Sequence, residues 1–472
     1  MNYQEALAYL YGLSDYERGG NYTRNRDENI PREAWLLEHL GNPQNDYDCT
    51  LIAGTKGKGS TASLIERVLR EAGLRTGLYT QPDLHTFRER MRVNGRLISE
   101  QEMAELVPEM RTIVDRLQAQ HRYGPFIMYE VATALALLYF SRQHVQHAVL
   151  EVGLGGRLDA TNVTQPLVSV ITSISYDHMQ ILGNTLAQIA TEKAGIVKPN
   201  GVLVTSAQSP EALLAITAIC RQRQSRMIRV GQAETDLAQE HVEAGQLPPI
   251  TYSYRLEVRD STRQRFIIHA PEHDYTGLEI PLKGQHQLEN ATAALATLEA
   301  LREKGVEWDE AALRAGFRAV RWSARVEVIG QRPTIVVDGA HNADSMQKLL
   351  QTLHTSFSFH RLIGVLSVAR DKDLVGIVKA LSEIDVVVVT HMVSARAATI
   401  EELVALFAEQ APGVQVHTAP TSNEAMDLAL ELADDNDLIF ATGSLYVASE
   451  VLRWSAAHGN AEVAATIEGV DH

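Results

Sequence analysis

Short runs of β-branched and apolar residues alternate with longer stretches of helical periodicity over the first two hundred residues. One helical stretch, "SEQEMAELVPEMRTIVDRLQ" (99–118), starts with Ser99 and has Glu102 three residues later, which predicts a capping box at its start. Short strands separated by helices are typical of α/β units on a mainly parallel sheet. The runs expected to form strands are "TLIAG" (50–54), "TGLYT" (76–80), "HAVLEVG" (147–153), "LVSVITSI" (167–174) and "GVLVTSA" (201–207).

The pattern changes between residues 250 and 282, where apolar and polar residues alternate in "ITYSYRLEV", "QRFIIHA" and "GLEIPL". Such alternation predicts a small antiparallel sheet attached to the first domain. A second α/β series follows, and the last dozen residues, 461–472, are expected to form a frayed tail. The strands expected in the second series are "TIVVDG" (334–339), "LIGVLS" (362–367), "DVVVVT" (385–390) and "DLIFAT" (437–442).

These patterns predict an α/β protein of two domains, residues 1–320 and 321–472. The first would hold the parallel sheet with the small antiparallel sheet, and the second would be a Rossmann-like α/β domain. The length of 472 residues is enough for more than one core.

Composition and charge narrow the class of function. The formal net charge of −16 argues against sequence-independent binding of nucleic acid, although a local basic pocket remains compatible with it. Cys49 and Cys220 are too few and too far apart for a disulfide framework or a thiolate metal site. The N-terminus lacks the pattern of a signal peptide, and the most apolar helical stretch (131–140) is about half the length of a membrane span. We therefore expect a cytoplasmic protein with neither a membrane nor a nucleic acid as partner.

The stretch "LIAGTKGKGS" (51–60) runs from an expected strand into a glycine-rich turn with two lysines. It is not the common Gly-x-x-x-x-Gly-Lys-Ser/Thr loop, because Ile52 stands at the first glycine position and Gly59 follows Lys58. Backbone N–H groups of residues 57–59 can still point at phosphate oxygens, and the helix that starts near Ser60 adds the positive end of its dipole. Lys58 would supply a positive charge and the Ser60 hydroxyl could reach Mg²⁺. A plain glycine-rich turn is the alternative.

Two further polar residues fall at the carboxyl ends of expected strands, where ligands of open parallel sheets bind. Glu151 closes one strand and His178 follows another in "SYDH". Magnesium prefers oxygen ligands, so an imidazole ligand would make Mn²⁺ an alternative to Mg²⁺. Taken alone, His178 is more typical of a hydrogen-bonded loop histidine than of a metal ligand. Lys193 lies in a helical pattern, where a solvated lysine paired with Glu192 is the ordinary interpretation.

The stretch "EVGLGGRLDATN" (151–162) is rich in glycine, but it is not a dinucleotide-binding fingerprint. That motif would require glycine at position 158, which is Leu158. A dehydrogenase is therefore disfavoured.

Taken together, the motifs of this chain resemble the Mur-ligase superfamily, and most closely its dihydrofolate synthase/folylpolyglutamate synthase family. They follow the order of that family over about residues 30 to 450, and the short phosphate loop is the form that those ligases use. Besides "GTKGKGS", the matching motifs are "FRERMRVNG", "YEVATALALLYF", "LEVGLGGRLDATN", "ITSISYDHMQILGNT", "IATEKAGIVK", "GQHQLENATAAL", "RWSARVE", "DGAHN" and "ATGSLY".

The resemblance implies a Mur-ligase-like fold with a P-loop ATPase domain, and it implies roles for individual residues. ATP phosphates would be held by the loop around Lys58, with Asn290, Arg325 and Asp338 as further nucleotide contacts. Lys193 would be carbamylated, which replaces a positive charge by a carboxylate-like group, and Lys58, Lys193 and His341 would be catalytic. The loop residues implied in ATP binding are Gly54, Thr55, Gly57, Lys58, Gly59 and Ser60, and those implied in binding Mg²⁺ (or Mn²⁺) are Ser60, Glu151, His178 and Lys193.

The activity that the resemblance implies is ATP-dependent addition of L-glutamate to dihydropteroate, to the γ-carboxylate of reduced folates, or to both, through an acyl phosphate. A monomer is expected. Alternatives are another Mur-type amino-acid ligase, or a non-catalytic switch that binds nucleotide without turnover.

Two segments depart from the family pattern. "TQPD" (80–83) stands where relatives usually have Thr-Ser-Pro-His, and "IMYE" (127–130) where they have Thr-x-Phe-Glu. Gln81 thus occupies a serine position expected to touch a metal or the pterin, and Ile127 and Met128 lie near the expected pteroate pocket. These departures leave the folate-side substrate open.

Overall fold

The computed structural model describes residues 1–14, 26–232 and 237–469. The chain forms two compact units. The first comprises Met1–Glu257, Phe266–Glu279 and His286–Val320, and the second comprises Val258–Arg265, Ile280–Gln285 and Arg321–His472. Because two short segments before residue 320 belong to the second unit, the units are not continuous in sequence. The division into domains at residues 320 and 321 stays a prediction.

The first unit is built on an 11-stranded sheet with the order β11-β10-β9-β8-β7-β6-β1-β5-β2-β3-β4. Its last two strands, β3 (Met91–Val93) and β4 (Arg96–Leu97), are attached by antiparallel pairing. Its central strands pair in parallel and are buried along almost their whole length, which explains why they read as continuous apolar runs. The five strands expected from the N-terminal runs are all present. They are β1 (Asp48–Ala53), β2 (Thr76–Tyr79), β5 (His147–Glu151), β6 (Val168–Ile171) and β7 (Val202–Thr205).

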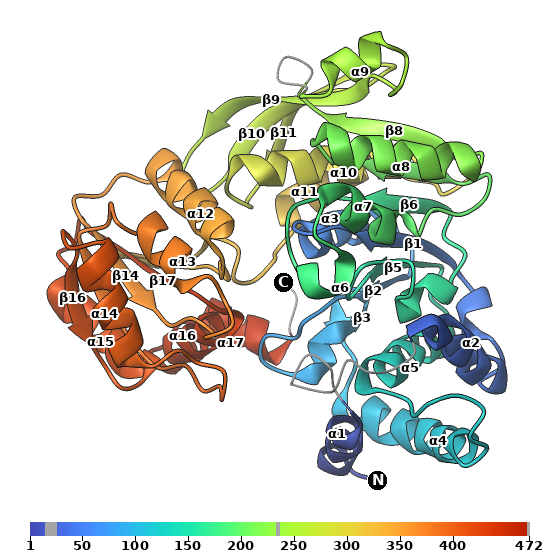
Figure 1. Ribbon diagram of the computed structural model, residues 1–472, viewed down its shortest axis with the longest axis horizontal. Helices are drawn as coiled ribbons and strands as arrows, with labels where there is room; N and C mark the ends of the chain where they lie inside the picture. Colours follow the sequence, from blue (N-terminus) through green and yellow to red (C-terminus); the bar gives the residue numbers. More distant parts are fainter. Residues whose placement is uncertain (15–25, 233–236, 470–472) are drawn as a thin grey trace. The chain divides into compact units, whose positions relative to one another are not determined.

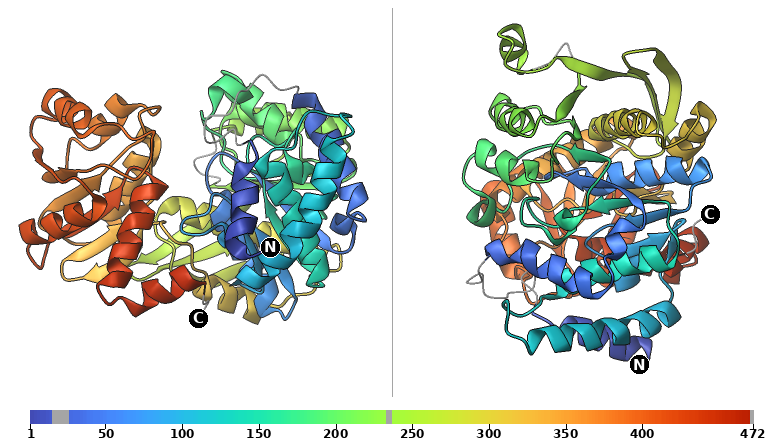
Figure 2. Two further views of the ribbon diagram at one scale, coloured as in Figure 1. Left: turned by 90° about the horizontal axis from the view of Figure 1, so that it is seen from below. Right: turned by 90° about the vertical axis from the view of Figure 1, so that its right-hand side faces the viewer.

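Helices cover both faces of the parallel part of this sheet (Figure 2). The capping box predicted at residues 99–102 is confirmed at the start of α4 (Glu100–Gln118). Helix α11 (Glu310–Ala319) packs closely against α3 (Lys58–Glu71) because Gly316 has no side chain: a Cβ at this position would lie 2.7 Å from a methyl group of Val68. The helices between and after these strands are α3 (Lys58–Glu71), α5 (Met128–Arg142), α7 (Leu186–Ala194), α8 (Pro210–Gln222), α10 (Gln285–Arg302) and α11 (Glu310–Ala319).

The strands expected as a small antiparallel sheet continue the main sheet instead of forming a sheet of their own (Figure 1). Strand β9 (Ile250–Arg259) pairs in parallel with β8 (Arg226–Gly231), followed by β10 (Gln264–His269) and β11 (Asp274–Ile280). This pairing satisfies the backbone groups that β8 would otherwise leave open at the edge. The alternating pattern revealed the strands and gave no information on which strand they pair with.

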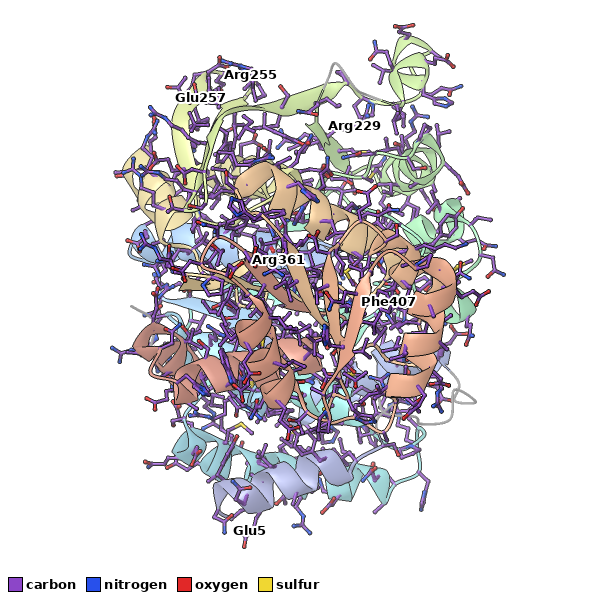
Figure 3. The ribbon with its side chains drawn as sticks, turned by 90° about the vertical axis from the view of Figure 1, so that its left-hand side faces the viewer. Glu5, Arg229, Arg255, Glu257, Arg361 and Phe407 are labelled. Carbon is purple, nitrogen blue, oxygen red and sulfur yellow. The ribbon has the colours of Figure 1, made fainter. Side chains whose placement is uncertain are left out.

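The second unit contains a six-stranded sheet with the order β12-β13-β17-β14-β15-β16, parallel except for the β12–β13 pair. The ion pair of Arg361 Nη2 with Asp437 Oδ2, 2.6 Å long, ties the starts of two neighbouring strands together. Arg361 and the core residue Phe407 of α14 (Ile400–Gln410) are labelled in Figure 3. The strands are β12 (Glu327–Gln331), β13 (Thr334–Val337), β14 (Leu362–Leu366), β15 (Val386–Val389), β16 (Gln415–Thr418) and β17 (Leu438–Thr442).

The prediction of a frayed tail at residues 461–472 is wrong for most of that range. Helix α17 (Ala461–Glu468) forms there because the side chain of Asn460 accepts a hydrogen bond from Val463 N and because Val463 is buried. Residues 470–472 lie outside the described part of the chain.

A buried ion pair joins α2 (Asn29–His39) to α5 in the first unit. Arg32 is fully buried, and its Nη2 lies 2.6 Å from Oε1 of the buried Glu130. Arg32→Leu would leave the carboxylate without its counter-charge, so we expect a loss of about 3–5 kcal/mol in the free energy of unfolding, measured by urea denaturation. Arg142→Gln, in an exposed pair with Glu109, is the control and should change it by less than about 1 kcal/mol. Equal effects would contradict the prediction.

Candidate active site

The glycine-rich loop ends at the start of α3 and leaves the amides of the first turn open. Gly57 is the N-cap in a left-handed conformation (φ 87°), and no side chain caps the helix. Thr61 is the first residue whose N–H bonds back into the helix, to Gly57 O at 2.9 Å. The N–H groups of residues 58–60 therefore have no acceptor within the helix, which is the arrangement that binds phosphate at helix N-termini.

Two positions of the loop require glycine, because neighbouring atoms lie too close to leave room for a Cβ. A Cβ at Gly54 (φ 151°) would lie 1.8 Å from Thr172 Oγ1, which donates a hydrogen bond to Lys56 O at 2.7 Å. A Cβ at Gly57 would lie 2.3 Å from Asn290 Oδ1. The structure thus places Asn290 of α10 directly beside the phosphate loop.

Gly57→Ala tests this close approach. We expect at least a 10-fold loss of ADP affinity, measured by calorimetry, because the new methyl group must displace either Asn290 or the loop. Gly73→Ala is a matched control: Gly73 has φ 88° and no atom within 4 Å of its Cβ position. The left-handed backbone should cost both variants about 1 kcal/mol of stability, and Gly57→Ala should lose more because of its contact with Asn290. Only Gly57→Ala should lose ADP binding. Equal ADP affinities would contradict the prediction.

Hydrogen bonds tie the loop to the segment that follows β6. Thr55 N donates to Ser173 O at 2.7 Å, and Thr55 Oγ1 donates to Ser175 O at 3.2 Å. The ammonium group of Lys56 lies 3.5 Å from Asp177 Oδ2. These contacts bring the sequence "SYDH" to the loop.

Glu151 ends β5, whose neighbour β1 leads into the loop, and it pairs in register with Ile52. The side chain is buried, and its Oε1 lies 3.7 Å from Lys58 Nζ. Its Oε2 accepts a hydrogen bond from Gln81 N at 3.3 Å. The carboxylate and the lysine predicted from separate motifs therefore lie side by side at one edge of the sheet.

Lys193 is not a solvated lysine. It is buried in α7, and its Nζ donates a hydrogen bond to Gly54 O at 2.7 Å, while Glu192 pairs with Arg157 instead. Burial, followed by the positive charge of Lys58, lowers the pKa of Lys193 to about 7. A substantial fraction of this amine is therefore neutral and nucleophilic near pH 7.

His178 is about half exposed and adopts a left-handed conformation (φ 48°) at the start of α6 (Met179–Leu182). Its Nε2 lies 3.7 Å from Asp177 Oδ1, and its backbone N–H donates to the same oxygen. Residues 26–232 and the other described ranges contain no group of three or more His, Cys, Asp or Glu side chains that could hold a metal. The predicted metal set instead combines Glu151 and His178 with a hydroxyl and a lysine.

The residues predicted from the C-terminal motifs lie in the second unit. Arg325 stands between Ala324 (φ 56°) and Val326 (φ 49°), a backbone region rare for β-branched residues and often found at functional sites. Asp338 holds this segment in place, since its Oδ2 accepts a hydrogen bond from Val326 N at 2.9 Å. Burial raises the pKa of the Asp338 carboxyl group. His341 Nδ1 lies 2.9 Å from Gly339 O.

The donor chemistry of the first unit fits ATP and a hard divalent cation. Open first-turn amides and Lys58 suit phosphate, while the Glu151 carboxylate and the Ser60 hydroxyl offer the oxygen ligands that Mg²⁺ prefers. The sequence did not single out the roles of Asp177, Tyr129 or Asp159, which also lie at this edge of the sheet. Asp177 could have been found from the sequence because it is next to His178. Tyr129 and Asp159 could not, because their partners are distant in sequence.

This fold and this site define a Mur ligase, and the comparison with protein families agrees. The Mur ligase middle domain matches residues 127–298, and the glutamate ligase domain of Mur ligases matches residues 324–445.

Similar proteins of known name identify the family within the Mur ligases. The chain is 32% identical to the dihydrofolate synthase/folylpolyglutamate synthase of Bacillus subtilis, over 95% of this chain and 98% of that protein. It is 36% identical to the enzyme of the same name from Mycobacterium tuberculosis, over 87% and 83%. It spans about half the length of a Haloferax volcanii relative described as a probable bifunctional folylpolyglutamate synthase/dihydropteroate synthase.

Solved structures give the same result. The M. tuberculosis folylpolyglutamate synthase complexed with ADP has a TM-score of 0.83 at 33% identity, covering 96% of this chain and 98% of that one. The Thermotoga maritima folylpolyglutamate synthase has a TM-score of 0.80 at 31% identity, covering 98% of both chains. The chain belongs to the dihydrofolate synthase/folylpolyglutamate synthase family, whose members are ATP-dependent ligases. Within the described ranges, none of the helices has both the length and the apolar character needed to cross a membrane.

Proposed function

We propose that this protein joins L-glutamate to the carboxylate of dihydropteroate, to the γ-carboxylate of a reduced folate, or to both, at the expense of ATP. The observation that carries this proposal is the grouping of an open helix N-terminus, Lys58, Glu151 and a buried Lys193 around one loop. A nucleotide-binding switch would need the phosphate loop but would not need a buried carboxylate and a lysine with a lowered pKa beside it.

The chemistry requires activation of a carboxylate. Transfer of the γ-phosphoryl group of ATP to a carboxylate oxygen forms a P–O bond and releases ADP, and the resulting acyl phosphate has a good leaving group. The glutamate amine then attacks the carbonyl carbon, phosphate leaves and the nitrogen loses a proton, which gives the amide. Lys58 and the first-turn amides would stabilise negative charge on the phosphoryl oxygens. A magnesium ion held by Ser60, Glu151 and His178 would neutralise charge on the same group when bound.

We further propose that Lys193 reacts with carbon dioxide to form a carbamate. The neutral amine attacks the carbon of CO₂, a C–N bond forms, and one proton is released to solvent. The product carries a negative charge and two oxygens, which could act as ligands for a cation beside the loop. The lowered pKa of Lys193 supports this proposal because only the neutral amine can react.

Arg325 and Asp338 remain predicted nucleotide contacts, and His341 remains a predicted catalytic residue. A monomer and a cytoplasmic location also remain predictions.

Phosphate release tests the proposed activity. It should be measured with dihydropteroate and with tetrahydrofolate, each with and without L-glutamate. We expect release that requires ATP, L-glutamate and at least one of the two acceptors. Nucleotide binding without turnover under all four conditions would favour the switch, and turnover with a different amino acid would favour another Mur-type ligase.

A further inference from the structure

The end of α7 that carries Lys193 is fastened to the loop after β5. In this loop, Arg157 N donates a hydrogen bond to Glu192 O at 2.8 Å, and the side chains of these two residues form an ion pair of 2.9 Å. A Cβ at Gly156 would lie 2.7 Å from Lys193 O. Just after the helix, a Cβ at Gly195 would lie 2.3 Å from Arg157 Cα. The two segments therefore lie backbone against backbone, and both glycines are needed for this contact.

Asn162 joins the two segments through its side-chain amide. Its Nδ2 donates to Arg157 O at 3.1 Å, in the loop, and to Gly195 O at 3.2 Å, after α7. Its Oδ1 and its backbone oxygen accept from Lys198 Nζ at 2.9 and 2.8 Å. An ammonium group can only donate, so the atom of Asn162 that faces it has to be the oxygen, which fixes the orientation of the amide. We call these two residues the Asn162–Lys198 clasp.

The clasp is held in place by its own neighbours. The backbone oxygen of Lys198 accepts from Ser225 Oγ at 2.7 Å, and Arg223 Nη1 donates to Gly195 O at 3.1 Å. Arg223 and Lys198 thus place two positive charges beside the C-terminal end of α7, where the helix dipole favours them. Burial lowers the pKa of Lys198 to about 8, so this amine is still mostly protonated at pH 7 and can donate to both oxygens.

A fixed helix end determines where the amine of Lys193 points. The side chain is buried, and its Nζ donates to Gly54 O at 2.7 Å. Holding a long lysine side chain in one conformation costs entropy, and a backbone that cannot shift keeps the amine from leaving this position. A carbamate nitrogen retains one hydrogen, so the modified side chain can still donate to Gly54 O. The position of the amine therefore suits both the unmodified and the carbamylated lysine.

We propose that the Asn162–Lys198 clasp positions Lys193 for carbamylation by fixing the end of α7 against the loop after β5. In this reaction the Lys193 nitrogen forms a bond to the carbon of CO₂ and one proton is released to solvent. Asn162 and Lys198 are positioning residues that act through Lys193. The inference rests on the carbamate of the proposed function. A loosened clasp should raise the CO₂ concentration needed for half-maximal carbamylation and leave the maximal occupancy unchanged.

The test is carbon-13 nuclear magnetic resonance of the protein equilibrated with labelled CO₂, which detects the carbamate without any turnover. Wild-type protein should give a carbamate signal that Lys193→Met lacks. Asn162→Asp keeps an acceptor for Lys198 and removes both N–H donors of the amide. We expect it to raise the half-saturating CO₂ concentration about 10-fold. Asn200→Asp, at an exposed position two residues after Lys198, is the matched control and should behave as wild type.

A second pair of variants tests the other half of the clasp. Lys198→Met removes the donors to Asn162, and the half-saturating CO₂ concentration should again rise severalfold. Lys198→Arg keeps a positively charged donor, so it should restore most of the occupancy that Lys198→Met loses. If the carbamate signal survives in Lys193→Met and disappears in Lys198→Met, then Lys198 is the modified amine and the proposal is wrong.

The remaining outcomes separate this inference from the proposed function. If wild-type protein gives no carbamate signal at any CO₂ concentration, the carbamate itself is wrong and the clasp has nothing to position. If wild-type protein and Asn162→Asp give the same signal with the same half-saturating CO₂ concentration, the carbamate stands and the clasp is overturned. A fall in maximal occupancy and melting temperature without a shift of the half-saturating concentration would show a merely structural role and would also overturn it.

Discussion

Glu151→Gln is expected to lower kcat for glutamate-dependent ADP release by about 10²- to 10³-fold at saturating ATP and Mg²⁺. The substitution keeps the shape of the side chain and its acceptor oxygen for Gln81 N, but it removes the charge that faces Lys58 at 3.7 Å. The folded state should change little, because Lys58 is partly exposed and can be solvated when its partner is neutral. The measurement is a coupled ADP assay together with thermal unfolding.

Glu109→Gln is the matched control for this variant, since Glu109 forms an exposed ion pair on α4. It should retain full turnover. If Glu151→Gln retained full activity at limiting Mg²⁺, the carboxylate would not be a metal ligand. If turnover and the melting temperature fell together, the role of Glu151 would be structural.

Much of the fold was predictable because its signals are local. Each expected strand from 50–54 to 201–207 is a run of apolar residues that becomes buried on both faces, and such runs are visible without knowledge of their neighbours. The capping box of Ser99 and Glu102 is likewise contained within four residues. The attachment of β9 to β8 was not predictable, because pairing depends on which edge of the sheet is open.

The site was predictable to the extent that its residues occur in motifs. The loop follows β1, Glu151 ends β5, and these two strands are neighbours, so the rule that ligands bind at the carboxyl ends of strands brought the loop and Glu151 together. The environment of Lys193 was not predictable, because its burial depends on contact with Gly54, 139 residues earlier in the chain. The same limit applies to Gln81, whose partner Tyr129 is 48 residues away.

Lys193→Met is expected to lower kcat by about 10²-fold or more and to make the remaining activity independent of carbon dioxide. In the wild-type protein, removal of dissolved CO₂ should lower activity, and its return should restore it, because the carbamate would form again on the neutral amine. If activity is the same with and without CO₂, the modification plays no part in turnover.

The pH dependence of this recovery tests the environment of Lys193 independently of the loss of activity. A lysine whose pKa is about 7 changes from mostly protonated at pH 6 to mostly neutral at pH 8. At a fixed concentration of dissolved CO₂, the initial rate of recovery should therefore rise about 10-fold over this range and level off above it. An ordinary lysine, with a pKa near 10.4, would give a rise of about 100-fold without levelling off. The plateau therefore distinguishes carbamylation of a buried Lys193 from a reaction at any exposed lysine, and a steady rise through pH 9 would show that the reacting amine is not the one beside Gly54.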